Sequence, residues 1–323
     1  GNLASNATTL HKLWQFEPED VLLHALPIFH IHGLFVALHC ALLNASKVLF
    51  LPSFNVENIL EGMRGDATVL MGVPTFYSRL LNSSEFRSED CDQMRLFISG
   101  SAPMTEQVHK AWTDKTNHKI LERYGMTEAG MITSNPYEGE RVPGTVGFAL
   151  PGVEVRVADE EGHEIDPGEI GCIEVRGPNI FQGYWQMPEK TAEEFREDGF
   201  FITGDLGTMD DEGRVSIVGR GKDLIISGGY NIYPKEIEVV LDEYPSVLES
   251  AVIGIPHADF GESVVAVVVA ESGQSVSEAE LKEFLSEKLA RFKQPRSIVL
   301  VRELPRNTMG KVQKNLLREQ YSA

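Results

Sequence analysis

Short apolar runs alternate with amphipathic stretches through the first 136 residues of the chain. The apolar runs have the length of buried strands and cover residues 21–26, 47–51, 68–72, 95–98 and 119–121. Helical periodicity separates them, at residues 4–17, 34–43, 55–63, 74–81 and 105–115. Asn55 is a favourable helix cap, and Pro74 suits the first position of a helix. Strands that alternate with helices predict an α/β fold with a doubly wound parallel sheet.

The pattern changes after Pro136, where short apolar segments are separated by turns that contain glycine. The turn pairs are Pro143-Gly144, Pro151-Gly152, Glu161-Gly162, Pro167-Gly168 and Glu212-Gly213. This spacing predicts a compact β-barrel or sandwich over residues 137–221. One helix interrupts it, with a predicted capping box formed by Thr191 and Glu194.

Residues 222–323 have the pattern of a small α+β domain. We predict a helix after Pro234, a strand over residues 264–270 and a second helix with a capping box at Ser277 and Glu280. The segment Gly219–Asp223 places two glycines around charged residues and is a reasonable hinge. The predicted organisation is a large N-terminal domain (1–221, with an α/β subdomain over 1–136 and a β-rich subdomain over 137–221) and a mobile C-terminal lid domain (222–323).

Composition narrows the classes of function. The 323 residues are 42% hydrophobic and 24% charged, as in ordinary soluble globular proteins. The formal net charge of −19 argues against a nucleic-acid partner, because phosphate backbones attract clustered lysine and arginine. No apolar run reaches the roughly 20 residues that a membrane span needs. Three widely spaced cysteines suggest a reducing compartment, so we expect a cytoplasmic protein.

Polar side chains are concentrated in the segment Glu122–Glu128, directly after the predicted strand at 119–121. Open α/β sheets bind their ligands at the carboxyl ends of the strands. Tyr124 offers a ring on which a base can stack, and Thr127 and Glu128 suit a phosphate and a magnesium ion. The alternative is a charged turn that only solvates the end of a strand.

Two further polar turns with glycine, at 99–103 and 203–207, support a nucleotide site. Small residues let a ligand approach the backbone, and Asp205 can accept both hydroxyl groups of a ribose. His30 and His32 form a His-x-His pair, but no third metal ligand stands at a useful spacing, so a pocket wall is the favoured interpretation. For Lys311, on a loop near the C-terminus, the alternative is a solvated basic tail.

Taken together, these stretches resemble the acyl-adenylate-forming superfamily, which includes acyl-CoA synthetases, firefly luciferase and peptide-synthetase adenylation domains. The motifs follow the family's order along nearly the whole chain: Ser99–Pro103, Tyr124–Glu128, Thr203–Asp205, Gly219–Asp223 and Pro305–Lys311. Within the superfamily the sequence is most similar to malonyl-CoA synthetases, through residues 26–34, 122–123 and 305–314. The resemblance implies that a carboxylate attacks the α-phosphate of ATP, giving an acyl-adenylate and diphosphate, and that the thiol of coenzyme A then displaces AMP.

The resemblance also implies roles for individual residues. These are adenine binding for Gly100, Ser101, Ala102 and Tyr124, ribose binding for Asp205 and Arg220, phosphate contact for Thr127, Mg²⁺ binding for Glu128, the hinge for Lys222, and the path of the CoA thiol for Gly228 and Gly229. Lys311 would bridge the attacking carboxylate and the α-phosphate, since a preorganised cation lowers the barrier between two anions. Rotation of the lid domain would bring Lys311 in for the first step and withdraw it for the second.

One part of the family pattern is absent. The phosphate-binding loop, rich in Ser, Thr and Gly with a Lys, does not occur in this sequence and would lie just before Gly1. Gly1–Asn6 reads as a helix start in mid-domain, without an initiator Met or signal-peptide character. We expect the chain to be part of a longer protein, lacking about the N-terminal third of a typical member.

Arg123 is the residue that discriminates between acids. Relatives that act on fatty or aromatic acids usually have a small or apolar residue here, facing the acyl pocket. A guanidinium can pair bidentately with a second carboxylate, which an apolar pocket would reject. Met131 and Ile31 would narrow the pocket to a three-carbon diacid, with His30 as a polar or plain wall. The alternative is an arginine that pairs with a neighbour such as Glu122.

The predicted function is therefore an ATP-dependent malonate–CoA ligase, whose partners are the small molecules malonate, ATP and coenzyme A. Three alternatives stay open. The first is a CoA ligase for another short acid such as methylmalonate. The second is an adenylation module that loads a carrier protein, although no carrier-like segment follows Ala323. The third is a non-catalytic nucleotide-binding relative, against which Lys311, Glu128 and Asp205 all argue by their presence.

Overall fold

The computed structural model describes residues 1–271, 273–308 and 310–322. These residues form two compact units. Unit 1 comprises Gly1–Thr203 and Gly207–Ile217, and unit 2 comprises Gly204–Leu206 and Val218–Ala323. No helix among the described residues is both long and apolar enough to cross a membrane.

Unit 1 contains a seven-stranded sheet in the order β2-β1-β3-β4-β5-β6-β7. Its strands are β1 (Val21–His24), β2 (Lys47–Phe50), β3 (Val69–Gly72), β4 (Leu96–Ser99), β5 (Leu121–Met126), β6 (Gly130–Ser134) and β7 (Phe148–Ala149). Strands β1 to β5 pair in parallel, and β6 and β7 continue the sheet antiparallel. Strand β2 lies on one side of β1 and strand β3 on the other, so the strand order reverses between β1 and β3. This arrangement confirms the predicted doubly wound α/β fold.

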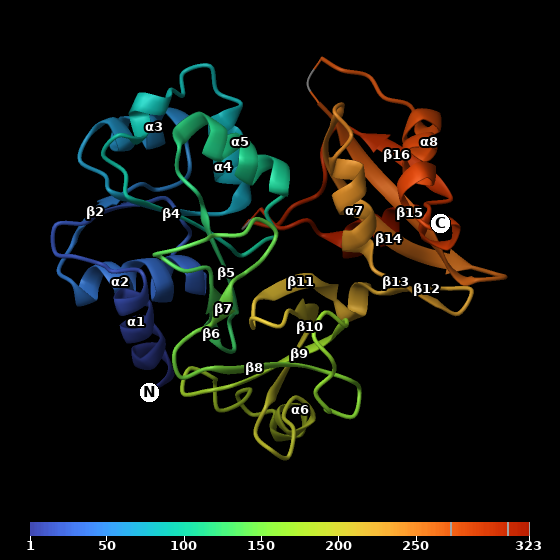
Figure 1. The fold of residues 1–323 in the computed structure, drawn as a ribbon, viewed down its shortest axis with the longest axis horizontal. Coiled ribbons are helices and arrows are strands. Elements are labelled where there is room, and N and C mark those ends of the chain that lie inside the picture. Colours follow the sequence, from blue (N-terminus) through green and yellow to red (C-terminus); the bar gives the residue numbers. More distant parts are fainter. Residues whose placement is uncertain (272, 309, 323) are drawn as a thin grey trace. The chain divides into compact units, whose positions relative to one another are not determined.

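Helices lie on both faces of this sheet (Figure 1). They are α1 (Asn2–Leu13), the π-helix η1 (His32–Ala37), α2 (Leu38–Leu43), α3 (Val56–Arg64), α4 (Pro74–Leu81), the 3₁₀-helix η2 (Ser88–Cys91) and α5 (Glu106–Thr116). Asn55 caps α3 by accepting a hydrogen bond from the backbone N–H of Asn58 at 3.0 Å. Pro74 occupies the start of α4. Both local predictions are confirmed.

The strand predicted at 119–121 begins later than expected. Strand β5 runs from Leu121 to Met126 and pairs with β4 only through Leu121 and Glu122. Its remaining residues pair with β6, and residues 127–129 form the turn between the two strands. Much of the polar segment 122–128 is therefore strand and not turn, because pairing with β6 outweighs the weak strand propensity of Glu, Arg and Gly.

The β-rich part of the chain forms a four-stranded sheet in the order β11-β10-β9-β8. Its elements are β8 (Glu154–Ala158), β9 (Gly171–Arg176), α6 (Pro188–Glu193), β10 (Phe201–Met209) and β11 (Val215–Arg220). The five predicted turn glycines all have positive φ, which only glycine adopts without strain: Gly144, Gly152, Gly162, Gly168 and Gly213.

The capping box predicted at Thr191 and Glu194 is wrong. Helix α6 starts at Pro188, so Thr191 lies inside it. The Thr191 hydroxyl donates to the carbonyl of Met187 at 2.9 Å, a bond to the preceding turn that replaces a cap. By contrast, Ser277 and Glu280 form the predicted reciprocal capping box at the start of α8 (Glu278–Lys288).

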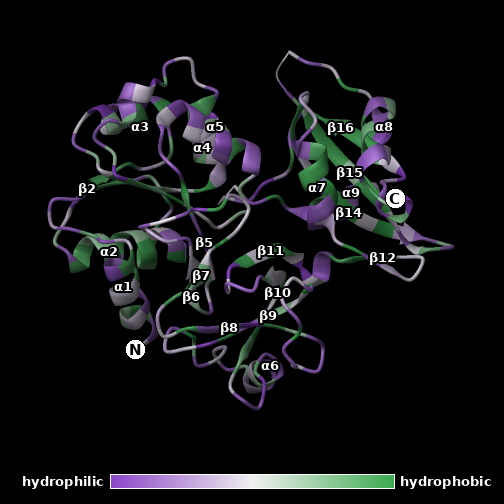
Figure 2. Cartoon of the chain, viewed as in Figure 1, coloured by the Kyte–Doolittle hydropathy of each residue, from purple (hydrophilic) through white to green (hydrophobic). Residues whose placement is uncertain are grey.

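Unit 2 contains a five-stranded sheet in the order β13-β12-β15-β14, with β16 paired to β15. Its other elements, besides α8, are η3 (Gly221–Asp223), β12 (Ile225–Ser227), β13 (Tyr230–Ile232), α7 (Pro234–Asp242), β14 (Val247–His257), β15 (Gly261–Ala270), η4 (Arg291–Lys293), β16 (Ser297–Val301) and α9 (Lys314–Tyr321). The central strands are strongly hydrophobic (Figure 2). Their side chains form one core with α7 and α8 and another with α9.

A buried ion pair ties several elements of unit 1 together. The Asp20 carboxylate, 3% exposed, accepts from Arg95 Nε at 2.6 Å, from Thr68 Oγ1 at 3.0 Å and from the Glu17 N–H at 2.8 Å. Burial alone would raise the pKa of Asp20, but these hydrogen bonds and the Arg95 charge outweigh it and hold the pKa below its usual range. The ionised form of Asp20 therefore stabilises the fold.

We expect Asp20→Asn to lower the free energy of unfolding by about 2–4 kcal/mol at pH 7, because it leaves Arg95 without its carboxylate. The contribution of Asp20 is present above its unfolded pKa of about 4 and is lost as pH falls through the lower folded pKa. The gap between wild type and variant should therefore narrow below about pH 4. Urea unfolding across pH measures this, with the exposed Asp66→Asn as control, for which we expect a much smaller loss of stability.

Candidate functional site

The carboxyl ends of the parallel strands carry several of the predicted site residues of unit 1, from both the adenine-binding and the acyl-pocket sets. Gly100 and Ser101 follow β4, His30 follows β1, and Arg123 lies in β5 next to β4. Parallel strands present their carboxyl ends at one edge of the sheet, where open α/β folds bind ligands. The sheet thus brings together side chains that are up to 93 positions apart in the sequence (Arg123 minus His30).

Arg123 is the central charge of this site. Its side chain is only 3% exposed, and its Nε and Nη2 atoms lack a hydrogen-bond partner among the described residues. Burial lowers the pKa of Arg123 to about 9, so the guanidinium keeps its positive charge near neutral pH. The alternative partner Glu122 instead accepts from the Gly144 N–H at 3.4 Å. Successive strand residues point to opposite faces, which separates Glu122 from Arg123.

Gly100 makes room for the guanidinium. A Cβ atom at this position would stand 2.3 Å from Nη1 and 2.4 Å from Cζ of Arg123. Real Cβ contacts are essentially never this short, so a side chain at residue 100 would displace Arg123. The glycine predicted to frame an adenine therefore also allows the charged group to lie against the backbone.

His30 and His32 stand beside this charge in different ways. His32 is fully buried and its Nδ1 lies 3.1 Å from the Ser101 hydroxyl, whereas His30 is half-buried. Burial and the Arg123 charge lower the pKa of both imidazoles, so both are neutral near pH 7. Among the described residues no group of three His, Cys, Asp or Glu side chains is placed to hold a metal ion.

The apolar residues predicted to narrow the pocket differ in burial. Met131 is 1% exposed, and its backbone N–H and carbonyl are bound by the Asn6 side chain at 3.0 and 2.8 Å. Asn179 donates to the same carbonyl at 3.1 Å. Ile31 is half-buried. Two buried amides therefore fix Met131, and sequence reasoning did not identify either of them.

The residues predicted to face the nucleotide lie around the β5–β6 hairpin. Tyr124 is half-buried and packs against a hydrophobic cluster, Thr127 is exposed in the turn, and Glu128 is half-buried. Glu128 Oε1 accepts from the Tyr184 hydroxyl at 3.2 Å. Magnesium is commonly held by one or two carboxylates together with substrate phosphates and water. A single oriented carboxylate fits that kind of site.

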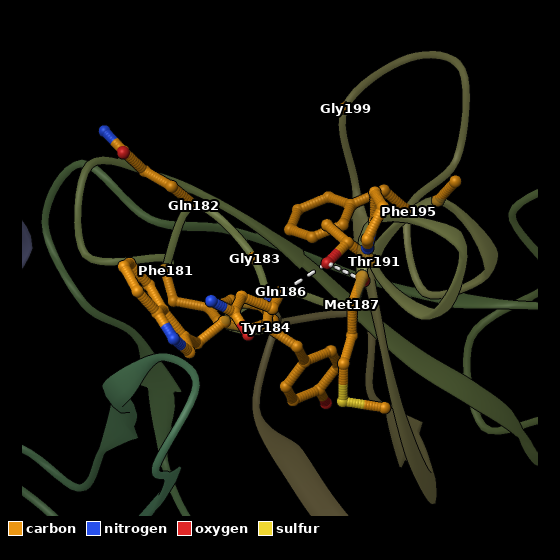
Figure 3. Close-up of a pocket in the computed structure, with 12 residues that line it drawn as sticks. Phe181, Gln182, Gly183, Tyr184, Gln186, Met187, Thr191, Phe195 and Gly199 are labelled. Carbon is orange, nitrogen blue, oxygen red and sulfur yellow. Dashed lines mark hydrogen bonds between the residues drawn. The ribbon is translucent and has the colours of Figure 1, made fainter.

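The sequence did not predict a role for Tyr184, because no local pattern near residue 184 indicates that its hydroxyl reaches Glu128. It belongs to a segment that lines a surface pocket of unit 1 (Figure 3). In this segment the Tyr184 N–H donates to the Thr191 hydroxyl at 2.9 Å, and that hydroxyl donates to Met187. This pair of bonds fixes the turn from which Tyr184 supports Glu128.

Unit 2 contains the other predicted nucleotide residues. Arg220 Nε lies 2.8 Å from Asp205 Oδ1, and Asp205 is 5% exposed. The Lys311 side chain reaches the surface, yet desolvation and then the positive charge of Arg220 lower its pKa, while Asp205 and Asp223 oppose the shift. Asp205, Arg220 and Lys311 thus lie within electrostatic range of one another, although Lys311 is 91 residues from Arg220 (311 minus 220).

The loop of Lys311 is held by local hydrogen bonds. The Asn307 N–H donates to the Lys311 carbonyl at 2.9 Å, and the Lys311 N–H donates to Asn307 Oδ1 at 3.0 Å. The Arg306 guanidinium donates to the Gly310 carbonyl and to the Glu249 carboxylate. Met309, part of the predicted motif, lies outside the described residues. These contacts position the lysine on a shaped loop and not on a free tail.

The remaining predicted positions are surface features. Lys222 is exposed in η3, and Ala102 is half-buried. Gly228 and Gly229 form the turn between β12 and β13, with φ values of 60° and 82°. Any other residue would be strained there, so the turn itself explains the two glycines.

Comparison with known proteins assigns the chain to a family. A profile described as "AMP-binding enzyme" matches residues 1–185, which is more than half of the chain. The chain belongs to the AMP-binding enzyme family. A second profile, "AMP-binding enzyme C-terminal domain", matches residues 236–311.

Individual members of the family are similar over nearly the whole chain. The chain is 60% identical to ATP-bound MatB from Rhodopseudomonas palustris, with a TM-score of 0.97, covering 99% of this chain and 64% of that one. It is 40% identical to "Probable CoA ligase CCL8" of Humulus lupulus, over 99% of this chain and 58% of the relative. It is 38% identical to "Malonate--CoA ligase" of Arabidopsis thaliana, over 98% and 57%. The chain spans about three-fifths of the length of these curated relatives.

We expect Gly100→Ala to displace the Arg123 guanidinium and to lower the free energy of unfolding by about 1–3 kcal/mol, as overpacking of a close contact does. Thermal or urea unfolding measures the loss. Gly219→Ala is the control, since nothing lies within 4 Å of the position that its Cβ would take. Equal stabilities of the two variants would contradict the close approach of Gly100 and Arg123.

Proposed function

We propose that the complete protein is an AMP-forming malonate–CoA ligase, which converts malonate, ATP and coenzyme A to malonyl-CoA, AMP and diphosphate. The observation that carries the proposal is the buried guanidinium of Arg123 with two unpaired N–H donors. Such donors are costly to bury unless a ligand pairs with them. A second carboxylate on the substrate supplies two acceptor oxygens in the bidentate geometry that arginine prefers.

The similarity to the curated malonate–CoA ligase supports the same substrate. Fixed, buried Met131 supports a short acid, because it leaves little freedom for the pocket to widen. These arguments favour malonate and do not separate it from methylmalonate, which differs by one methyl group. A methylene or methyl in an apolar pocket is worth only about 1–3 kcal/mol of discrimination.

In the first half-reaction the malonate carboxylate attacks the α-phosphate of ATP, the new C(O)O–P bond forms and diphosphate leaves. Lys311 would stabilise the negative charge that collects between the two anions. Glu128, supported by Tyr184, would hold Mg²⁺, which neutralises phosphate charge when bound. Tyr124, Gly100, Ser101 and Ala102 would bind the adenine, and Thr127 would contact phosphate.

In the second half-reaction the thiolate of coenzyme A attacks the acyl carbon and AMP leaves. Asp205 and Arg220 would hold the ribose throughout, and their ion pair preorganises both groups. Lys222 would serve as the hinge of a C-terminal lid over residues 222–323, and the Gly228-Gly229 turn would line the path of the thiol. The acidic, cysteine-poor composition supports a cytoplasmic location.

The deciding experiment is AMP release by the complete protein with a panel of mono- and dicarboxylates, with and without coenzyme A. The proposal expects malonate to give the highest kcat/KM and AMP release to depend on coenzyme A. Preference for methylmalonate would support the first alternative. Tight ATP or AMP binding without malonate-dependent diphosphate exchange would support a non-catalytic relative.

We expect Arg123→Leu to abolish malonate activation, a fall of at least about 100-fold in kcat/KM, because the distal carboxylate would be buried without a partner. Some activity on a short monoacid should survive, since the nucleotide-facing residues are unchanged. Steady-state kinetics with malonate and propionate measure both effects. Malonate turnover with an unchanged KM would remove Arg123 from the substrate site.

We expect Lys311→Ala to reduce malonate-dependent diphosphate exchange by at least about 100-fold, the size of effect seen when a preorganised charge-stabilising group is removed. Isotope exchange between diphosphate and ATP isolates this half-reaction from thioester formation. Lys288→Ala is a suitable control, because this lysine pairs with Glu243 on the surface of the same unit. A wild-type exchange rate in Lys311→Ala would exclude the lysine from adenylation.

A further inference from the structure

His32 is a buried imidazole with one nitrogen engaged and one free. Its side chain is completely buried, Nδ1 lies 3.1 Å from the Ser101 hydroxyl, and Nε2 has no hydrogen-bond partner among the described residues. Leaving a polar atom unpaired in a protein interior destabilises the folded state. The usual fate of a buried histidine is to have both nitrogens bonded, so an unpaired Nε2 requires an explanation.

The backbone at Ser101 is strained in the way that functional sites often are. Ser101 has φ 69°, in the left-handed region that non-glycine residues rarely adopt. Such a conformation is unfavourable and persists only where its surroundings hold it. Here the strained residue places its hydroxyl on His32 Nδ1, so the strain is coupled to the orientation of one imidazole.

The adjacent residues Gly100 and Ser101 link His32 to Arg123. Gly100, the residue before Ser101, lies against the Arg123 guanidinium, and the Arg123 charge also contributes to the low pKa of His32. His32 is the first residue of the π-helix η1, a rare conformation that often marks functional sites. Gly33 allows this start, since a Cβ there would stand 2.3 Å from the Pro27 carbonyl oxygen.

Nε and Nη2 of Arg123 and Nε2 of His32 are thus buried at the carboxyl edge of the sheet without a hydrogen-bond partner among the described residues. Burial, and after it the Arg123 charge, lowers the pKa of His32, so the imidazole is neutral and carries a single ring proton. If the Ser101 hydroxyl donates to Nδ1, that proton is on Nε2, which becomes a third N–H donor. A carboxylate has about four lone-pair sites and can accept all three bonds.

We propose that His32, oriented by Ser101, is a second specificity-determining residue of the acyl pocket, donating its Nε2–H to the distal carboxylate that Arg123 pairs with. This inference rests on the proposed function, since it needs a dicarboxylate substrate. A monoacid would leave the His32 donor unpaired as well as the guanidinium, which strengthens the rejection of monoacids. In this proposal Ser101 acts as a positioning residue, because its hydroxyl donates to Nδ1 in the tautomer whose Nε2 is a donor.

Two substitutions separate the two ring nitrogens. The side-chain amide of His32→Gln places an N–H near the position of Nε2 and gives up the contact to Ser101. The shorter amide of His32→Asn keeps an atom near Nδ1 and loses the donor at Nε2. The readout is the ratio of kcat/KM for malonate to kcat/KM for propionate, in which a methyl group replaces the distal carboxylate. A loss of folded protein cancels from this ratio.

We expect His32→Asn to lower the ratio about 10- to 100-fold, through a higher KM for malonate and an unchanged KM for ATP, because a hydrogen bond to a charged group is lost. His32→Gln should restore most of the ratio. Ser101→Ala should lower the ratio in the wild-type background but not in His32→Gln, whose amide does not use the hydroxyl. His39→Asn is the matched control on the following helix and should leave the ratio unchanged.

The outcomes separate this inference from the proposed function. A donor at Nε2 requires the ratio to fall in His32→Asn and to be largely kept in His32→Gln. Any other pattern in these two variants contradicts such a donor. If the ratio is insensitive to His32→Asn but collapses in Arg123→Leu, the malonate assignment holds and the His32 inference fails. If the wild-type protein does not prefer malonate to propionate, both fail.

Discussion

A buried guanidinium with two nitrogens that have no hydrogen-bond partner among the described residues imposes the main constraint on this molecule. Arg123 carries a full charge at an almost inaccessible position, with two of its nitrogens unpaired. Proteins normally neutralise or pair such a charge, because the penalty for burying it alone is several kcal/mol. We infer that Arg123 forms a preorganised anion site, because its desolvation cost is met in the folded protein before a ligand binds. A substrate carboxylate would recover that free energy on binding.

The surroundings of Arg123 are shaped by the same requirement. Gly100 has no side chain because the guanidinium occupies the space that a Cβ would need. Ser101 tolerates a strained backbone and bonds to His32. In strand β6, Met131 is fixed by Asn6, whose side-chain amide bonds to both the N–H and the carbonyl of Met131. Close packing, strain and buried polar bonds thus collect around one charge, as expected where function and not stability selects the residues.

The residues proposed to act on the nucleotide are divided between the two units. Unit 1 contains Glu128, which Tyr184 orients, and unit 2 contains the Asp205–Arg220 ion pair and Lys311. Within unit 2 the lysine already experiences the charges of Arg220 and Asp205, so their mutual electrostatics do not depend on unit 1. Such a division suits a reaction in which one group of charges serves adenylation and then withdraws, which is the role proposed for the C-terminal lid.

The sequence by itself determined the elements with local causes. The parallel sheet followed from alternating apolar runs, the cap of α3 from Asn55, the capping box of α8 from Ser277 and the turns from their glycines, because neighbouring residues decide these features. Motif resemblance pointed to Arg123. Only the tertiary structure decided the start of β5, the absence of a cap at Thr191, and the contacts of Arg123 with Gly100, His32 with Ser101 and Glu128 with Tyr184. These depend on pairing between strands and on side chains far apart in sequence, and no local pattern encodes such partners.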